Sequence, residues 1–271
     1  MRGRVLIIAG SDSGGGAGIQ ADIKSCTALG AYAATAITAL TAQDTTGVHG
    51  VHPVPLGFIQ QQIRLSLEDI GADAVKTGML ADSATIGAVC DTLSAHGARL
   101  PLVADPVMVA KGGHALLDGG AVDTLRRRLL PLASLITPNL PEAEVLAGMT
   151  IGTVEEMRAA AQVILAMGVP AVLLKGGHLP GSRVVDLLAT ADGIEAFENP
   201  RIESRHTHGT GCTLASAIAA GLAQGMPLRD AVARARLYVR AALASAPGLG
   251  RGHGPLNHAV TLDPARLATL S

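Results

Sequence analysis

Short apolar runs alternate with longer amphipathic segments along most of the chain. The run RVLIIAG at 4–10 is apolar from Val5 to Ala9, as expected for a strand that is buried on both faces. Segment 55–70 instead places Leu56, Ile59 and Ile63 at helical spacing, which predicts an amphipathic helix. By the same criteria, further strands are predicted at 31–43, 72–79, 100–108, 134–139 and 170–177, and further helices at 19–29, 83–97, 121–132, 155–168, 213–224 and 228–246.

Two more apolar runs, RVVDLLAT at 183–190 and GIEAFENP at 193–200, flank the turn Ala191-Asp192-Gly193 and predict a β-hairpin. Strands that alternate with helices are typical of a mostly parallel sheet covered by helices on both faces, so the expected class is α/β. No linker, repeat or low-complexity segment interrupts the pattern. We therefore expect a single domain over residues 1–271.

Composition excludes several classes of partner. The net charge is −1 and Trp is absent, so the chain has neither the basic surface nor the aromatic platforms typical of nucleic-acid binding. No run approaches the ~20 apolar residues of a transmembrane helix, and no membrane association is expected. The three cysteines Cys26, Cys90 and Cys212 form no CxxC pair, which argues against a disulfide framework and favours a reducing, cytoplasmic environment.

Polar and glycine residues follow six of the predicted strands. Because the carboxyl ends of parallel strands meet at one edge of the sheet, and ligands bind there in open α/β sheets, these residues predict the functional site. They are Gly10-Ser11-Asp12, Gln43-Asp44, Lys76–Met79, Asp105–Met108, Thr137-Pro138-Asn139 and Lys175–His178. The close pairs His49/His52 and His206/His208 have no further ligands nearby in sequence, which disfavours metal binding by imidazoles.

The glycine-rich stretch SGGGAGIQAD opens a predicted helix. No lysine follows Gly18, so the stretch is not a P-loop, and its glycine spacing is not that of a Rossmann dinucleotide site. It is either a flexible turn that needs glycine or a loop that brings backbone against a ligand. The residues alone leave both interpretations open.

Two other motifs have a structural and a functional interpretation. In NLPEAE, Asn139 at the helix start and Glu142 three residues later match a capping box, and the alternative is that Glu142 orders a hydrated Mg²⁺ beside phosphates. The pattern alone favours the cap. In LLKGGH, Lys175 is either the polar edge of a core strand or a point charge for a phosphate.

The motif THGTGCT at 207–213 places Cys212 at the predicted start of an apolar helix. The free amides and the dipole of a helix amino end favour an anion, such as a phosphoryl group, and would also stabilise a thiolate at Cys212. The structural interpretation is that Cys212 is a small buried filler. We favour the functional interpretation, because the flanking glycines leave the site open.

Taken together, the motifs resemble the hydroxymethylpyrimidine/phosphomethylpyrimidine kinases of thiamine biosynthesis, in the ribokinase-like superfamily. The segments that carry the resemblance run in order from about residue 5 to residue 258: AGSDSGGGAGIQADIK, ALTAQDTTGV, KTGML, DPVMVAKGG, LITPNLPEAE, LLKGGH, THGTGCTLASAIAAGL and GHGPLNH. The resemblance implies a three-layer α/β/α sandwich with a mainly parallel central sheet, often dimeric. It also implies ATP and Mg²⁺ as cofactors, a small pyrimidine as substrate, and two successive phosphorylations.

The resemblance further implies roles for the residues around Cys212. The thiol occupies the place of the aspartate base of sugar-kinase relatives, as a base or as an orienting group, and the amides from Gly209 to Gly211 form the anion hole. Asn139 and Glu142 match the superfamily motif N-x-x-E, so Glu142 is expected to hold water on Mg²⁺ and can cap its helix as well. The remaining expected residues are Lys175, Thr207, Gly209 and Thr210 at the ATP phosphates and Asp105 at the metal.

The pyrimidine is expected at Gln43, whose amide offers a donor and an acceptor side by side. The family positions that line the ring pocket correspond here to Gly10, Asp22, Met79 and Val107. Two alternatives stay open: a pyridoxal kinase of the same cysteine-bearing branch, and a catalytically silent homologue that only binds ligands.

Overall fold

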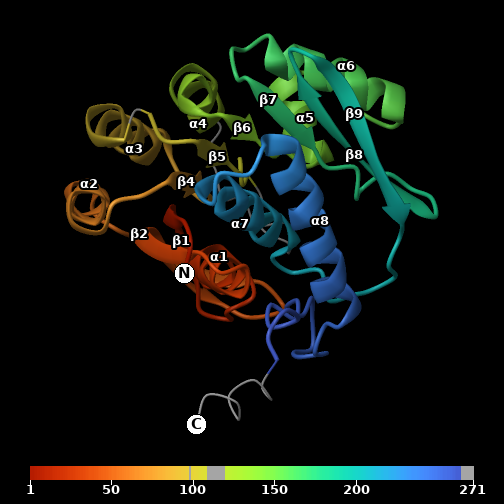
Figure 1. Ribbon diagram of the computed structural model, residues 1–271, viewed down its shortest axis with the longest axis horizontal. Helices are drawn as coiled ribbons and strands as arrows, with labels where there is room; N and C mark the ends of the chain where they lie inside the picture. The colour runs from red at the N-terminus through yellow and green to blue at the C-terminus, as the bar shows by residue number, and fades with distance from the viewer. Residues whose placement is uncertain (98, 109–119, 264–271) are drawn as a thin grey trace.

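A nine-stranded sheet runs through the computed structural model, which describes residues 1–97, 99–108 and 120–263 (Figure 1). The strand order is β3-β2-β1-β4-β5-β6-β7-β8-β9. All pairings from β2 to β7 are parallel. These strands are β1 (Arg4–Asp12), β2 (Tyr32–Gln43), β4 (Ala74–Thr77), β5 (Leu102–Ala104), β6 (Leu135–Ile136) and β7 (Ala171–Leu174).

Antiparallel strands extend the sheet at both ends. On one side β8 (Arg183–Thr190) and β9 (Gly193–Pro200) form the hairpin that the sequence predicted, and β8 pairs with β7. On the other side β3 (Val48–Pro53) pairs with β2, and the sequence pattern did not indicate this strand. Its residues are largely exposed and include glycine and proline, so no apolar run marks it. Pairing with the long β2 defines it instead.

Helices cover both faces of the sheet, which confirms the predicted α/β sandwich. One layer holds α1 (Gly18–Ala28), α7 (Thr210–Ala223) and α8 (Leu228–Ala244). The other holds α2 (Leu56–Leu65), α3 (Ser83–His96), α4 (Ala121–Thr124), α5 (Leu140–Ala147) and α6 (Val154–Leu165). Irregular turns at Ser66–Ile70 and Leu125–Leu132 prolong α2 and α4.

The surroundings of the central strand β1 explain the uninterrupted apolar run in its sequence. Leu6 and Ile8 pack into the core beneath α2 and α3, whereas Val5 and Ile7 pack into the core beneath α7. Successive side chains of a strand point to opposite faces, and both faces are covered, so every position from Val5 to Ala9 is apolar. Burial on both faces therefore accounts for the uninterrupted run.

The amino end of α7 differs from the sequence prediction, which placed the start of this helix at 213. The helix begins at Thr210, after Gly209 as its N-cap. The apolar pattern starts only in the second turn, because the first turn faces a cavity instead of the core. The motif DPVMVAKGG is described only as far as Met108, and its last residues, 109–113, lie outside the described part of the chain. Among the described residues, no helix combines the length and the apolar character needed to cross a bilayer.

The segment after α8 returns to α7 through His258. His258 Nε2 lies 2.9 Å from the hydroxyl of Thr213, and the Tyr238 hydroxyl donates to the His258 carbonyl oxygen at 2.8 Å. The His258 side chain is buried. Burial lowers the pKa of this imidazole to about 4, and the charge of Lys24 adds to the effect.

We expect acid to destabilise the fold through this histidine. The unfolded chain takes up a proton on His258 below about pH 6.5, whereas the folded chain does so only near pH 4. The free energy of unfolding should therefore fall between these two pH values, by up to about 3 kcal/mol. Urea denaturation of wild type and His258→Gln at each pH isolates this contribution. An unchanged difference between the two proteins from pH 7 to pH 4 would contradict it.

Candidate active site

The carboxyl ends of five neighbouring strands, β1 and β4 to β7, are joined by four backbone hydrogen bonds just beyond the ladder. Gly78 N donates to Ile8 O, Asp105 N to Thr77 O, Thr137 N to Ala104 O and Lys175 N to Pro138 O, all within 3.0 Å. Each strand thus holds the first polar residues of its neighbour in register. This aligns side chains that are far apart in the sequence along a single edge.

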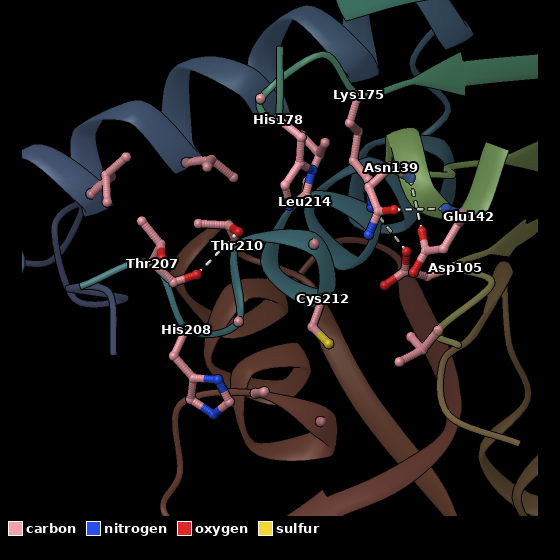
Figure 2. Close-up of a pocket in the computed structure, with 18 of the residues that line it drawn as sticks. Asp105, Asn139, Glu142, Lys175, His178, Thr207, His208, Thr210, Cys212 and Leu214 are labelled. Carbon is pink, nitrogen blue, oxygen red and sulfur yellow. Dashed lines mark hydrogen bonds and ion pairs between the residues drawn. The ribbon is translucent and has the colours of Figure 1, made fainter. Parts of the chain in front are cut away.

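A cavity of about 690 Å³ opens at this edge, between the strand ends and the amino end of α7. It is lined by the residues to which the resemblance assigned roles, with the exception of Asp22. These residues are Gly10, Gln43, Met79, Asp105, Val107, Asn139, Glu142, Lys175, Thr207, Gly209, Thr210, Gly211 and Cys212. The structure therefore brings one set of predicted residues into one space (Figure 2).

The first turn of α7 presents its backbone to the cavity. Gly209 has a φ of +81°, and a Cβ atom there would lie 1.8 Å from Gly16 O, so only glycine fits against the loop that follows β1. No described side chain caps this helix. The amides of Gly211 and Cys212 are consequently free to bind an anion, and the helix dipole favours one.

Lys175 and Asp105 lie beside this turn. Lys175 Nζ is 3.2 Å from Asp105 Oδ1, and a Cβ atom on Gly211 would lie 3.2 Å from Nζ. Burial lowers the pKa of Lys175, but the Asp105 and Glu142 carboxylates raise it further, so the net shift is upward. A cation therefore stands next to the free amides, and the absence of a side chain at residue 211 keeps the space between them open.

Glu142 caps α5, as the pattern predicted. Its Oε2 accepts from Asn139 N at 2.8 Å, while Asn139 Oδ1 accepts from Glu142 N at 3.0 Å (Figure 2). Burial raises the pKa of Glu142 to about 7, and Lys175 opposes this shift. A carboxyl that is buried in the cavity wall and costly to ionise without a cation suits a site where positive charge binds.

The oxygen donors in this wall fit Mg²⁺. Asp105 and Glu142 supply two carboxylates close enough to interact electrostatically, with the Asn139 side chain adjacent. No group of three or more His, Cys, Asp or Glu residues forms a metal cage among the described residues. Mg²⁺ characteristically keeps several waters and binds through one or two carboxylates together with substrate phosphates, and the two carboxylates in this wall match the protein's share of that donor set.

Cys212 lies on the cavity wall and is partly exposed. Burial raises the pKa of its thiol to about 12, and the nearby Asp22 and Asp105 carboxylates contribute, whereas Lys76 lowers it. The expectation that the helix amino end yields a thiolate is thus wrong for the free enzyme. Desolvation and two neighbouring negative charges outweigh the helix field and the nearby lysine cations.

Asp22 does not line the ring pocket, contrary to the sequence prediction. Its carboxylate is fully buried and binds Lys76 Nζ at 2.8 and 3.0 Å and the Ser216 hydroxyl at 2.6 Å. Lys76 is itself fully buried and stands between Asp22 and the cavity. A carboxylate this far from water needs a full set of partners, and those partners hold it behind the wall.

The other predicted ring contacts come from four neighbouring strands and the residues that follow them. Gly10 of β1 approaches Met79, which follows β4, since a Cβ atom at residue 10 would lie 3.0 Å from the Met79 sulfur. Gln43 ends β2 and Val107 follows β5, and both line the same cavity. A cavity lined by sulfur, branched methyls and an amide suits a small heteroaromatic ring.

Comparison with known proteins identifies the family. The sequence model described as phosphomethylpyrimidine kinase matches residues 12–257, most of the chain. The chain belongs to the phosphomethylpyrimidine kinase family.

Curated relatives in this family align over nearly the whole chain. Hydroxymethylpyrimidine/phosphomethylpyrimidine kinase of Bacillus subtilis is 47% identical over 94% of this chain and 94% of its own length. Thiamine biosynthesis bifunctional protein ThiED of Geobacter sulfurreducens is 54% identical over 98% of this chain. The chain spans about half (54%) of that longer protein.

Solved structures share the ribokinase-like fold. Pyridoxal kinase of Bacillus subtilis in complex with ADP superimposes with a TM-score of 0.90 at 38% identity, covering 97% of this chain and all of the other. Phosphomethylpyrimidine kinase of Clostridium difficile gives a TM-score of 0.78 at 41% identity, covering 88% of this chain and 97% of the other.

Several site residues escaped the sequence analysis. His208 contacts Asp12 at 2.8 Å, although the sequence showed it only as half of a histidine pair. Asp186 of β8 accepts from Gly176 N and pairs with Arg236 of α8, both in the wall near Lys175. No local pattern signals either contact, because the partners are 196 and 50 positions apart.

The raised pKa of Cys212 predicts slow alkylation. At pH 7.5 we expect iodoacetamide to modify this thiol at least about tenfold more slowly than a cysteine peptide, whose thiol titrates near pH 8.5. The rate should keep rising beyond pH 9.5, where the peptide levels off. Peptide mass spectrometry separates Cys212 from Cys26 and Cys90, and the unfolded protein serves as the accessible control. Modification at the peptide's rate at pH 7.5 would show a thiolate instead.

Proposed function

We propose that this chain transfers the γ-phosphoryl group of ATP to 4-amino-5-hydroxymethyl-2-methylpyrimidine, and then to the resulting monophosphate, in thiamine biosynthesis. The proposal rests on the uncapped amino end of α7, which lines the same cavity as Lys175 and carries Cys212. Family membership and the names of the curated relatives support the same reaction.

The free amides of Gly211 and Cys212 would bind the transferred phosphoryl group between donor and acceptor. Phosphoryl transfer depends mainly on positioning and on stabilising charge, and here both come from backbone that is already in place. Lys175 adds a cation at the same point. Glu142, Asn139 and Asp105 would hold Mg²⁺ through water, and the ion would neutralise charge on the ATP phosphates.

Cys212 is the residue nearest to the expected acceptor hydroxyl, and its protonation state decides its role. A thiol cannot accept a proton, so the resting enzyme uses Cys212 to orient the hydroxyl. A base role requires that the sulfur first lose its proton, and Lys76 is the cation that favours this step. The monophosphate acceptor is already ionised and needs no base.

A second candidate function is the phosphorylation of pyridoxal. It is favoured by the TM-score of 0.90 to the pyridoxal kinase of Bacillus subtilis, a structure that also contains ADP. Pyridoxal likewise carries a hydroxymethyl group on a heteroaromatic ring. The sequence comparisons favour the pyrimidine, and kcat/KM on the two rings separates the candidates.

We also propose that the chain forms a single domain, that it is a cytoplasmic homodimer and that it binds no nucleic acid. One continuous sheet across the described residues supports a single domain. A homodimer, a cytoplasmic location and the absence of a nucleic-acid partner follow from the sequence and its resemblance alone. Sedimentation of the purified chain tests the dimer.

The decisive experiment is mass analysis of the products formed from ATP, Mg²⁺ and the hydroxymethylpyrimidine. We expect the monophosphate first and the diphosphate later. Absence of any phosphorylated pyrimidine would refute the proposed function, and accumulation of the monophosphate alone would remove its second step.

Exchange of Cys212 and of Lys175 should affect the two steps differently. Cys212→Ala should slow monophosphate formation by about 10²-fold, as is typical when a proton-handling group is lost, but should slow conversion of supplied monophosphate far less. Lys175→Met should impair both steps, because the cation faces the transferring group in each. Separate initial rates with each acceptor test this. Equal losses in the cysteine variant would refute the division of roles.

Glu142→Gln distinguishes metal binding from capping. If the carboxylate holds water on Mg²⁺, the variant should need more Mg²⁺ for half-maximal rate while the KM for the pyrimidine stays unchanged. The amide retains an oxygen that can accept from Asn139 N, so the loss of stability should not exceed about 1 kcal/mol. A lower melting temperature with an unshifted Mg²⁺ titration would assign the residue to the cap alone.

A further inference from the structure

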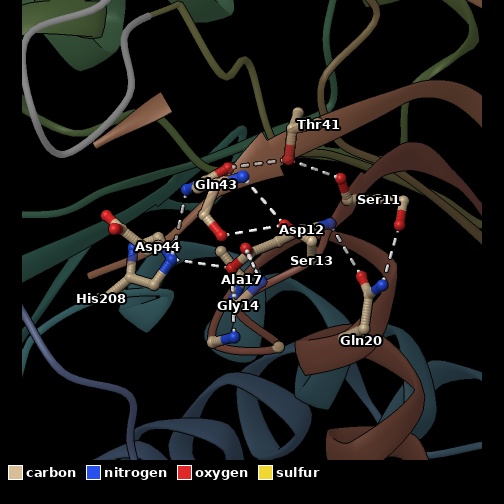
Figure 3. A network of polar contacts seen from close by, with 12 residues as sticks. Ser11, Asp12, Ser13, Gly14, Ala17, Gln20, Thr41, Gln43, Asp44 and His208 are labelled. Carbon is tan, nitrogen blue, oxygen red and sulfur yellow. Dashed lines mark hydrogen bonds and ion pairs between the residues drawn. The ribbon is translucent and has the colours of Figure 1, made fainter. Parts of the chain in front are cut away.

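A second polar network, apart from the phosphate-binding turn, surrounds Gln43 at the acceptor end of the cavity (Figure 3). His208 Nε2 lies 2.8 Å from Asp12 Oδ2 and 3.4 Å from the side-chain nitrogen of Gln43. On the other side of the amide, Gln43 Oε1 is 3.1 Å from the Thr41 hydroxyl, which is also 2.8 Å from the Ser11 carbonyl oxygen.

Asp12 decides where the proton of His208 lies. Burial raises the pKa of Asp12, but hydrogen bonds from His208 and from the amides of Ala17 and Gly14 outweigh it, so the net shift is downward. Asp12 Oδ2 also accepts from Gly16 N at 3.1 Å and Ala17 N at 2.8 Å. A carboxylate can only accept, and His208 Nε2 must therefore carry the hydrogen and donate it to Asp12.

The hydrogen atoms then determine which way the Gln43 amide faces. A ring nitrogen that carries a hydrogen cannot accept one, and the single Nε2 hydrogen points mainly at Asp12. The Gln43 group at 3.4 Å can share this hydrogen only if it is the oxygen, because an N–H group there would face another N–H. The Thr41 hydroxyl has a single hydrogen, and the Ser11 carbonyl takes it at 2.8 Å. Thr41 Oγ1 is thus an acceptor toward Gln43. Turning the amide by 180° about its last torsion places the nitrogen at Thr41, where it donates to Oγ1. It places the oxygen at His208, where it is a second, weaker acceptor beside Asp12 for the Nε2 hydrogen.

We propose that Asp12 and His208 are positioning residues that, together with Thr41, hold the Gln43 amide in this one orientation. The fixed amide thereby selects a ring that carries an amino donor beside a ring-nitrogen acceptor. The proposal rests on the proposed function, because it assumes that Gln43 meets the ring. In this orientation Gln43 keeps one N–H and one oxygen lone pair for a ligand. The amidine edge of an aminopyrimidine supplies the complementary pair, whereas a ring without the amino group leaves the oxygen unpaired.

The surroundings keep His208 from turning. His208 and Asp12 are 8% and 3% exposed, so water does not compete well for their contact. The imidazole packs against the glycine loop, since a Cβ atom at Gly16 would be 2.6 Å from His208 Cδ2. The His208 amide donates to Gly254 O at 3.2 Å, which anchors the residue from behind. The amide orientation is therefore set before a ligand arrives.

Binding calorimetry with two ligands tests the proposal without relying on catalysis. The ligands are the 4-amino-5-hydroxymethyl-2-methylpyrimidine and its analogue without the amino group. We expect wild type to bind the amino compound at least about tenfold more tightly, the range of one directed hydrogen bond. His208→Phe removes the donor and Thr41→Val removes the acceptor at the other end of the amide. In both variants the ratio should fall below about threefold, while the affinity for the analogue stays nearly constant.

Matched variants separate orientation from general damage. His208→Gln carries an amide nitrogen that can donate to Asp12 and should retain the preference, and His96→Phe, at the exposed end of α3, serves as the surface control. If His208→Phe does not fold, Thr41→Val makes the same test from the opposite side. Wild type without a preference, or both variants with the wild-type ratio, would overturn the proposal. A preference in a protein that phosphorylates neither compound would refute the proposed function and leave the inference standing.

Discussion

The amino end of α7 touches the loop after β1 backbone to backbone, and this contact decides where the other groups of the site can lie. Gly209 adopts a left-handed conformation, and any side chain on it would collide with the carbonyl of Gly16. Because no side chain fills this point, the helix directs free amides and its dipole into the cavity. The anion site therefore consists of backbone, which needs no reordering when a phosphate arrives.

Buried ion pairs surround that backbone and make the walls stiff. Three of these contacts join a carboxylate to a cation from a distant segment of the chain, namely Asp22 to Lys76, Asp105 to Lys175 and Asp186 to Arg236, and a hydrogen bond joins Asp12 to His208 in the same way. A buried charge without a partner is strongly destabilising, so such pairs tolerate little displacement. A site whose charges are already fixed can stabilise developing charge at little cost in reorganisation. The same pairing keeps Asp22 out of the ring pocket and holds His208 against Asp12.

Cys212 shows how a local rule yields to its surroundings. A helix amino end by itself favours a thiolate, and the motif GTGC therefore predicts a thiolate from the sequence alone. In the folded chain, burial and the carboxylates of Asp22 and Asp105 raise the pKa of the thiol, and Lys76 compensates only in part. The electrostatic balance at the sulfur depends on three side chains that approach it from other elements.

The sequence by itself determined the alternation of strands and helices, the β8–β9 hairpin, the cap of Glu142 on Asn139 and the set of residues at the strand ends. These features depend on periodicity, turns and contacts within a few residues, and on the rule that parallel strands end at one edge. The tertiary structure decided the features that need distant partners. Strand β3 exists because β2 offers it an edge, although its own residues show no strand pattern. Asp22 faces Lys76 instead of the ring, 54 positions away, and His208 meets Asp12 across 196 positions. Such contacts arise only when separate elements pack together, since no local pattern encodes which buried charge will find which partner.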